Sequence, residues 1–576
     1  MCGIVGTFNM DASPPKIQLI EELLGTINHR GPDAKNIARM DNVVFGNTRL
    51  SIIGISTIKA SLPINDDFFM LAFNGEIYNY KELNKILIQN NISVEGKSDS
   101  ETLFLFLKNF GIDKTLKVID GMYAFAFYDK ENKIMYIARD KIGERFVYWS
   151  LSNKCLIFAS EIKSIIKSKL CAVQPNLNRI DDYLYTAKVN GSETIFDNIQ
   201  ELEAGTYLSI KKGQSKPKIF NYWKIEDSFD CSDNNFDKDF LNNFSSAVNS
   251  RLVSDVPASF LLSGGIDSNA LVAQSLENSN ISNIDLFFCD NENSEFSEYQ
   301  DVKRSVSFFK NKFKDKNLIL NTHKTSYEEY MQELEEVAWF YDEPIQFVNT
   351  MLLSKICSKI KDKNYKVCLS GEGSDELLFG YNRFVNTFNK IRNMPLTEDK
   401  LKLLYFGGGM HSVPVIENLT NNSGVMGYSN TEPWLWLKNN INRDVNQLQL
   451  LYSQKYRLQM LLQRQDRIGM MHSIEIRTPF LAPKFISYVN NLSIKEKYNQ
   501  NNQETKVILK RAMKNLMPDE IINKKKQGFP SDMLNWISTD KMKSVVTETI
   551  KNSNSFCNSY LDGNYANQIV EEHFEG

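Results

Sequence analysis

The feature that most constrains the fold is a strand–turn–helix unit at residues 260–276, FLLSGGIDSNALVAQSL. An apolar run ends in Ser263-Gly264-Gly265-Ile266-Asp267-Ser268, and a helical pattern follows at once. Paired glycines let backbone N–H groups approach phosphate oxygens, and the helix N-terminus adds its dipole. The further apolar runs IDLFFCD, NLILNTH and YKVCLS alternate with helical stretches. This alternation predicts an α/β nucleotide-binding domain with a parallel sheet.

Residues 1–210 show a different pattern, with short strands and few helices. The runs MLAFNGEIYNY, GMYAFAFYDK, KIMYIARD, FVYWSL and LIFAS are apolar and aromatic, and a D-K-E-N-K turn joins two of them as in a hairpin. The stretches EIYNYKELNKILIQNN and SETLFLFLKNF have the apolar spacing of helices. We predict a strand-rich α+β domain here.

The polar segment 211–237, rich in Gly, Pro, Asp, Ser and Asn, is the predicted linker. The second domain would then occupy residues 238–576. After about residue 385 the pattern is helical, and we predict a helical C-terminal part without strands.

Composition excludes several classes of function. The net charge of −3 provides no general attraction to nucleic acid, and no apolar run is long enough to span a bilayer. The N-terminus lacks the basic region of a signal peptide, so we expect a cytoplasmic protein. Eight cysteines without a C-x-x-C pair and five scattered histidines argue against disulfide scaffolds and zinc sites.

Cys2 is a candidate nucleophile. Removal of Met1 would give Cys2 a free α-amine, which titrates near pKa ~7.7–8.0 and can act as a local general base. A thiol activated in this way can attack an acyl group without a histidine partner. Most second-position cysteines have no such role, so the interpretation depends on the surrounding motifs.

Five short motifs occur in order along the N-terminal region. They are Cys2-Gly3-Ile4-Val5-Gly6, His29-Arg30-Gly31-Pro32-Asp33, Arg49-Leu50-Ser51-Ile52-Ile53, Asn74-Gly75-Glu76-Ile77-Tyr78-Asn79 and Ser98-Asp99-Ser100-Glu101. Together they resemble the glutaminase domain of the class II, N-terminal-nucleophile glutamine amidotransferases over about the first 200 residues. The resemblance implies layered antiparallel sheets with helices.

The same resemblance implies roles for individual residues. Arg49 would anchor the α-carboxylate of glutamine and Asp99 its α-ammonium, while the Asn74 amide and the Gly75 N–H would stabilise the oxyanion. Taken singly, Arg49 would suit a surface salt bridge and Asn74-Gly75 a hairpin turn. The implied glutamine-binding residues are Arg49, Leu50, Ser51, Ile52, Ile53, Asn74, Gly75, Glu76 and Asp99.

The glycine turn at 263–268 lacks the lysine of a Walker A loop. It matches S-G-G-x-D-S, the pyrophosphate loop of enzymes that adenylate a substrate. A second element follows the run YKVCL and reads Ser370-Gly371-Glu372-Gly373-Ser374-Asp375-Glu376-Leu377. Asp267 and Asp375 are candidate Mg²⁺ ligands, because Mg²⁺ on phosphates usually takes one or two carboxylates. The alternative for Glu372, Asp375 and Glu376 is a solvated first helical turn, which the helix dipole favours, but the surrounding pattern argues against it.

When the N-terminal motifs and the two glycine motifs are taken together, the chain resembles the glutamine-hydrolysing asparagine synthetase family over nearly its whole length. The match continues through residues 466–481, DRIGMMHSIEIRTPFL, then Thr505-Lys506 and K-K-x-G-F at 525–529. The family implies that Glu372 helps to form an acyl-adenylate and that Lys506 stabilises the pyrophosphate-forming transition state. Without the resemblance, Lys506 is one of many lysines. The implied ATP site comprises Leu261, Leu262, Ser263, Gly264, Gly265, Asp267, Ser268, Cys289, Ser370 and Gly371.

Several positions depart from the family pattern. Residues 139–148 read RDKIGERFVY where R-D-x-x-G-x-K-P-L-Y is usual, and Ala482 replaces an aspartate. Residues 342–350, DEPIQFVNT, do not copy the usual segment, and Cys289-Asp290 replaces a small residue and glycine. Most of these departures lie in the half that chooses the acceptor.

The sequence therefore predicts an ATP-dependent amidating ligase that uses Cys2 to release ammonia from glutamine, with aspartate as the leading acceptor. A related amidotransferase acting on a uronic-acid sugar or another carboxylate is the alternative. S-G-G-x-D-S also occurs in tRNA-modifying ATPases, but the net charge and the glutaminase motifs argue against these. We expect small-molecule substrates, no nucleic-acid or membrane partner and, by analogy with the family, a homodimer.

Overall fold

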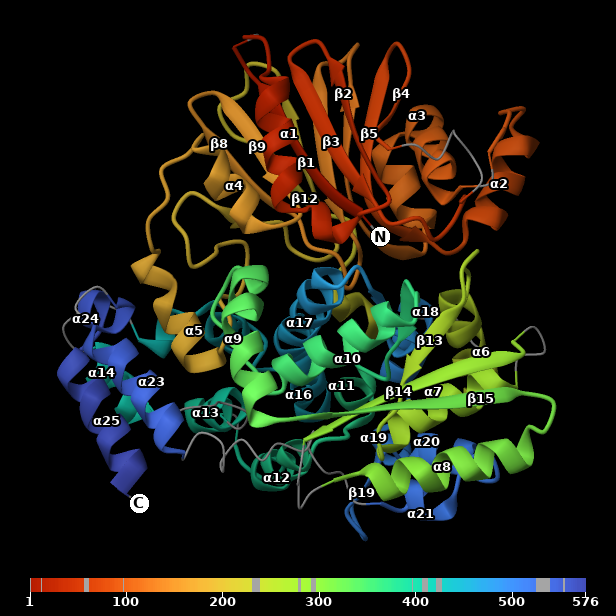
Figure 1. The fold of residues 1–576 in the computed structure, drawn as a ribbon, viewed down its shortest axis with the longest axis vertical. Coiled ribbons are helices and arrows are strands. Elements are labelled where there is room, and N and C mark those ends of the chain that lie inside the picture. Colours follow the sequence, from red (N-terminus) through yellow and green to blue (C-terminus); the bar gives the residue numbers. More distant parts are fainter. Residues whose placement is uncertain are drawn as a thin grey trace.

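Two antiparallel sheets form the core of the upper lobe in the computed structural model (Figure 1). In order across the first sheet, its described strands are β10 (Gln200–Glu201), β8 (Tyr148–Ser152), β9 (Cys155–Ala159), β1 (Cys2–Asn9), β3 (Val43–Arg49) and β2 (Ala34–Met40). Those of the second are β12 (Lys218–Asn221), β11 (Thr206–Lys211), β7 (Ile134–Arg139), β6 (Gly121–Asp129), β5 (Phe69–Ile77) and β4 (Ile64–Asn65).

The two sheets pack face to face. Apolar side chains from both, among them Phe45, Phe158, Met70 and Ile137, share one buried cluster. Helices cover the outer faces: α1 (Ile17–Thr26) and α4 (Ile162–Ser168) on the first sheet, α2 (Tyr80–Gln89) and α3 (Asp99–Val118) beside the second. The predicted α+β layers, the hairpin between β6 and β7, and both predicted helices are confirmed.

The first part of the predicted linker belongs to this lobe. Residues 218–221 form β12, which pairs with β11 at the edge of the second sheet. Regular strand structure therefore extends to residue 221, inside the segment 211–237 that the polar composition had indicated to be an irregular linker. Residues 230–237 of that segment lie outside the described part of the chain.

A parallel sheet organises the lower lobe. Its described strands run in the order β15 (Asn317–Thr325), β14 (Asn283–Asn291), β13 (Ala258–Leu261), β16 (Val367–Leu369) and β17 (Glu475–Arg477). Neighbouring strands all pair in parallel. The four strands predicted in the α/β pattern are confirmed.

The expectation of no strand after residue 385 is wrong. β17 completes the parallel sheet, and β18 (Tyr498–Asn499) pairs with β19 (Glu504–Thr505). β17 is only three residues long, and two of them, Glu475 and Arg477, are charged. Both are buried and pair with each other at 2.6 Å between Nε and Oε1. Burial of a paired charge removes the apolar signal by which a strand is found in sequence.

Helices surround this sheet and continue beyond it. In chain order they are α5 (Ile180–Thr186), α6 (Phe240–Arg251), α7 (Ile266–Leu276), α8 (Tyr299–Lys312), α9 (Tyr327–Tyr341), α10 (Thr350–Asp362), α11 (Ser374–Leu378), α12 (Asn382–Ile391), α13 (Glu398–Phe406), α14 (Val413–Thr420), α15 (Glu432–Asn439), α16 (Val445–Tyr452), α17 (Leu458–Met471), α18 (Pro483–Asn490), α19 (Ile494–Lys497), α20 (Val507–Met513), α21 (Asp519–Ile522), α23 (Asp540–Lys551), α24 (Phe556–Tyr560) and α25 (Gly563–Glu575). A π-helical turn, Ser453–Arg457, joins α16 to α17.

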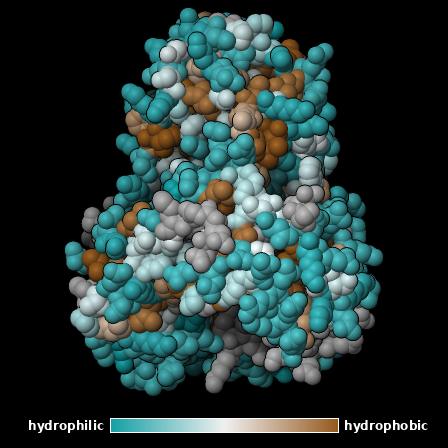
Figure 2. Space-filling model, turned by 90° about the vertical axis from the view of Figure 1, so that its left-hand side faces the viewer, coloured by the Kyte–Doolittle hydropathy of each residue, from teal (hydrophilic) through white to brown (hydrophobic). Residues whose placement is uncertain are grey.

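The structure describes the chain except residues 1, 12, 56–61, 97, 230–238, 278–280, 292–296, 396, 407–412, 421–426, 525–538, 553–554 and 576. In the space-filling view, a narrower upper lobe sits on a wider lower one (Figure 2). Within the described ranges, no helix combines the length and apolarity needed to cross a bilayer.

Candidate functional site

Cys2 is the first residue of β1, an inner strand of the first sheet. It pairs in register with Arg49 of β3, and its side chain is buried. Its backbone N–H donates to Asn74 Oδ1 at 3.1 Å. Burial raises the pKa of the thiol, and the charge of Arg49 opposes that shift. Because a buried thiol stays protonated near neutral pH, this cysteine needs a base to become a nucleophile.

Asn74 and Gly75 lie on β5 beside Cys2. Asn74 is fully buried, and its Nδ2 has no hydrogen-bond partner among the described residues. An unpaired buried donor is costly unless a ligand accepts from it. Gly75 has φ +147, and a Cβ there would come within 2.1 Å of the Met122 carbonyl oxygen. Only glycine fits at this position, so the chain can pass close to β6 next to the nucleophile.

The predicted glutamine anchors lie around the same residue. Arg49 Nη2 donates to the carbonyl oxygens of Ile53 at 3.3 Å and Gly54 at 3.1 Å, which holds the guanidinium over the loop 50–54. Asp99 begins α3 and accepts from the Ile77 N–H at 2.9 Å. Burial raises the pKa of Asp99.

A second carboxyl group shares this buried environment. Burial, and then the charge of Asp99, raises the pKa of Glu76 well above its usual value. Two buried carboxyls this close resist ionising together. A neighbouring positive charge would relieve that repulsion.

Arg30 is a residue for which the sequence suggested no role. It is fully buried, and its Nε donates to the Cys2 carbonyl oxygen at 3.2 Å. Its Nη1 and Nη2 donate to Asp466 on α17 at 3.0 and 2.9 Å. Arg30 therefore fixes the backbone of the candidate nucleophile and also forms an ion pair with a residue of the lower lobe.

The phosphate-loop motif forms the predicted turn between β13 and α7. Ser263 N–H donates to Ser268 Oγ at 3.0 Å, and Asn269 Nδ2 donates to the carbonyl oxygens of Ser263 and Gly265, each at 2.8 Å. Gly264 N–H donates to Glu298 Oε2 at 3.0 Å. These bonds curl the loop around the first turn of α7, where the helix dipole favours an anion.

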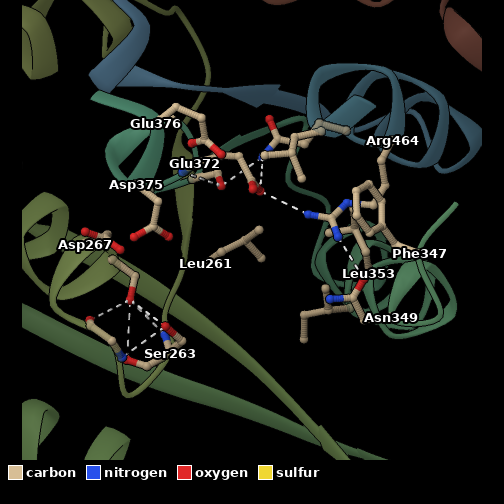
Figure 3. Close-up of a pocket in the computed structure, with 18 of the residues that line it drawn as sticks. Leu261, Ser263, Asp267, Phe347, Asn349, Leu353, Glu372, Asp375, Glu376 and Arg464 are labelled. Atoms are coloured by element: carbon tan, nitrogen blue, oxygen red, sulfur yellow. Dashed lines mark hydrogen bonds and ion pairs between the residues drawn. The ribbon is translucent and has the colours of Figure 1, made fainter. Parts of the chain in front are cut away.

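One pocket lies between this loop, the turn after β16 and α17 (Figure 3). Its walls include most of the predicted ATP-site residues, namely Leu261, Leu262, Ser263, Gly265, Asp267, Ser268, Cys289, Ser370 and Gly371, together with the predicted catalytic residue Glu372 and the candidate metal ligand Asp375. Gly264 and Lys506 are not in its lining. The pocket is at the carboxyl ends of β13 and β16, the usual ligand position in an open parallel sheet.

Lys506 is buried, unlike an ordinary surface lysine. It precedes α20 with a positive φ of 56, and its Nζ lies 2.6 Å from both carboxylate oxygens of Asp267. The same ammonium lies 2.5 Å from Asp375 Oδ1. The two candidate metal ligands thus come close enough to share one cation, which is the donor arrangement that a phosphate-bound Mg²⁺ uses.

Glu372 faces the other end of the pocket and is held by α17. Arg464 Nη2 and Gln465 Nε2 each donate to Glu372 Oε2 at 3.1 Å. Gln465 also donates to Ser370 Oγ at 3.0 Å. Arg464 Nη1 donates to Asn349 Oδ1 at 2.8 Å, and the guanidinium lies 5.1 Å from the Phe347 ring centroid (Figure 3).

Arg464 and Gln465 were missed by the sequence interpretation. They directly precede Asp466-Arg467, and that adjacency was the available signal. The departures from the family pattern separate spatially: Phe347, Asn349 and Cys289 line the pocket, whereas Ala482 is packed in the hydrophobic core away from it. The motif at 525–529, with Lys525, Lys526, Gly528 and Phe529, lies outside the described residues.

Glu376, in the same pocket, gives a pH-dependent prediction. Burial raises its pKa to about 7, with the charges of Asp375 and Glu372 adding to the shift. The folded state then binds more protons than the unfolded state between about pH 4.5 and 7, so stability should fall as pH rises through that interval. Glu376→Gln should be more stable than the parent above pH 7, by up to ~3 kcal/mol, and equal to it below about pH 4.5.

Thermal unfolding of both proteins from pH 4 to 8 measures this difference. Glu277→Gln, an exposed carboxyl at the end of α7, is the matched control and should show no such pH dependence. An offset between Glu376→Gln and the parent that is the same at every pH would contradict the buried-proton explanation.

Fold and site together define a glutamine amidotransferase joined to an ATP-dependent synthetase domain. The asparagine synthase family matches residues 239–576, and the glutamine amidotransferase domain family matches residues 1–223. The chain belongs to the asparagine synthase family and is a carbon–nitrogen ligase that uses glutamine and ATP.

The proteins to which the chain is similar include asparagine synthetases and an amidase. Asparagine synthetase [glutamine-hydrolyzing] 1 of Bacillus subtilis is 26% identical over all of this chain and 93% of its own length. Asparagine synthetase [glutamine-hydrolyzing] 3 of the same organism is 28% identical over 92% of this chain and 87% of its own. Amidase chyE of Penicillium rubens is 25% identical over all of this chain and 95% of its own.

Proposed function

We propose that the protein amidates a carboxylate through an acyl-adenylate, with ammonia released from glutamine at Cys2. The observation that carries this is the buried Lys506, which bridges Asp267 and Asp375 beside a phosphate loop in a chain whose Cys2 contacts Asn74. Neither half alone performs the whole reaction: one supplies ammonia and the other an activated acyl group.

In the upper lobe, the Cys2 thiolate attacks the carboxamide carbon of glutamine. Its proton passes to the α-amine of processed Cys2, which Asn74 Oδ1 holds in place. The oxyanion accepts from Asn74 Nδ2 and the Gly75 N–H. The α-ammonium of Cys2 then gives its proton to the leaving nitrogen, so the intermediate collapses, the C–N bond breaks and ammonia leaves. Water hydrolyses the thioester to glutamate and frees the thiol. Arg49 and Asp99 orient the glutamine α-carboxylate and α-ammonium.

In the lower lobe, an oxygen of the acceptor carboxylate attacks the α-phosphorus of ATP and displaces pyrophosphate. The loop Ser263–Ser268 holds the phosphates, and Lys506 neutralises charge that develops on the leaving group. Asp267 and Asp375 would hold Mg²⁺, which supplies further charge neutralisation when bound. Ammonia then attacks the acyl carbon, and AMP leaves. Glu372, fixed by Arg464 and Gln465, lies at the acyl end of the pocket.

Aspartate is the first acceptor to test, because relatives named asparagine synthetase match the whole chain. Purified protein with Mg-ATP should release pyrophosphate when the correct acceptor is added, and with glutamine it should form the amide. If aspartate elicits no pyrophosphate while glutaminase activity is intact, aspartate is not the acceptor.

The second candidate is a larger carboxylate such as a uronic-acid sugar. Phe347 and Asn349, which replace the usual family segment, form part of the pocket wall and contact Arg464. A site that pairs a polar substrate group rejects analogues lacking it by roughly 10⁴–10⁵-fold. The departures at these two residues therefore favour testing an acceptor other than aspartate.

A further inference from the structure

Two arginines of the synthetase pocket are not neutralised by its carboxylates. Each acidic residue of the pocket apart from Glu376 has a cationic partner: Asp267 and Asp375 share Lys506, Glu372 pairs with Arg464, and Glu298 pairs with Lys524. Arg383 and Arg457 also line the pocket, and neither forms an ion pair within the described residues. Glu376 instead accepts a hydrogen bond from the Tyr381 hydroxyl at 2.7 Å.

The two arginines come from different elements and meet at the same wall. Arg457 ends the π-helical turn before α17 and is mostly buried. Arg383 is exposed at the first turn of α12, and its guanidinium lies 4.4 Å from the Tyr381 ring centroid. Burial and the charge of Arg383 lower the pKa of Arg457 to about 10, so Arg457 stays charged near neutral pH. Two neighbouring cations without a counter-ion cost stability, and an anionic ligand would offset that cost.

We propose that Arg383 and Arg457 bind a second anionic group of the acceptor, a phosphate or carboxylate remote from the carboxyl group that is amidated. The inference rests on the proposed function, since it assumes that the reacting carboxyl lies near Glu372 and Arg464. It names the substrate class: an acidic acceptor considerably longer than aspartate.

The spacing along one helical face supports this length. Arg457, Met460, Leu461 and Arg464 all line the pocket, and they recur at the three- and four-residue intervals of one face. Arg457 and Arg464 are seven positions apart, which corresponds to about 10 Å along the helix axis. The carboxyl carbons of aspartate are separated by only two carbons, and bond lengths limit that distance to about 4 Å. An acceptor longer than aspartate therefore matches the axial spacing of these two arginines better.

Three acceptors test the proposal: aspartate, a hexuronate, and the same hexuronate bearing a phosphate on its anomeric carbon. Pyrophosphate release with Mg-ATP is measured for the parent, Arg383→Gln and Arg457→Gln. We expect the phosphorylated hexuronate to be used with a KM at least about tenfold below that of the plain hexuronate. Arg383→Gln should raise that KM by about tenfold or more while leaving the KM for ATP unchanged.

Arg392→Gln, at the other end of α12 and outside the pocket lining, is the matched control and should leave both KM values unchanged. Arg383 is exposed, so its variant keeps the test valid if Arg457→Gln fails to fold. An increase in the KM for ATP in place of the acceptor would assign the arginines to the triphosphate and overturn the proposal. Equal use of the two hexuronates, or aspartate as the preferred acceptor with a silent Arg383→Gln, would also overturn it. If no acceptor releases pyrophosphate although ATP binds, the adenylation step itself is wrong and the inference falls with it.

Discussion

Replacing Cys2 with alanine should abolish glutamine-dependent amidation, by about 10³-fold or more, and leave amidation by free ammonia largely intact. The thiol is the only atom at the glutaminase site that can form the thioester. The adenylation pocket uses none of its atoms, so externally supplied ammonia should still displace AMP. Rates with glutamine and with ammonium chloride, measured on the same preparation, check both halves of the expectation.

Cys155→Ala provides the matched control, because Cys155 lies on β9 of the same sheet and should be dispensable. Glutamine hydrolysis by Cys2→Ala would rule out Cys2 as the nucleophile. Mass spectrometry adds a separate check: active enzyme that retains Met1 would show that the α-amine of Cys2 is not the base.

Lys506→Ala should lower the kcat of pyrophosphate release by roughly 10²–10³-fold. The ammonium bridges Asp267 and Asp375, so its removal deletes a preorganised positive charge and leaves two carboxylates facing the phosphates. The expected loss therefore appears in adenylation with either nitrogen source, and glutaminase activity without ATP should persist.

Removing one partner of a buried ion pair also destabilises the fold, commonly by about 3–5 kcal/mol. Retained glutaminase activity and a thermal unfolding scan separate a folded, inactive variant from a misfolded one. Lys510→Ala is the control for loss of a nearby lysine on α20. Lys510 pairs with Glu504 at 3.2 Å and lies outside the pocket lining. If Lys506→Ala keeps wild-type kinetics, the role of the buried lysine is purely structural.

Local signals in the sequence explain why much of this architecture could be predicted. The strands β13 to β16 are compact apolar runs separated by helical spacing, and the glycine turn fixes where the phosphate loop must lie. Cys2, Asn74 and Gly75 belong to short motifs that are recognisable one at a time. Each of these features is contained within about ten consecutive residues.

The parts that were missed depend on contacts between distant segments. Arg30 and Asp466 are 436 positions apart, yet they form a bidentate pair. Arg464 lies in a helix, where a charged residue ordinarily indicates a solvent-facing position. Its contact with Glu372 is seen only in the folded structure. β17 was missed for the same reason, because its buried charges are paired across space and leave no apolar run in the sequence.

Three consecutive residues of α17 have a consequence for recombination between homologues. Arg464 and Gln465 hold Glu372, and the next residue, Asp466, holds the arginine that contacts the Cys2 carbonyl. A chimera joining this N-terminal lobe to a relative's C-terminal lobe would keep Arg30 and could lose its carboxylate partner. Exchange of the lobes between homologues should therefore keep both sites intact only where the incoming C-terminal lobe carries an acidic residue at position 466.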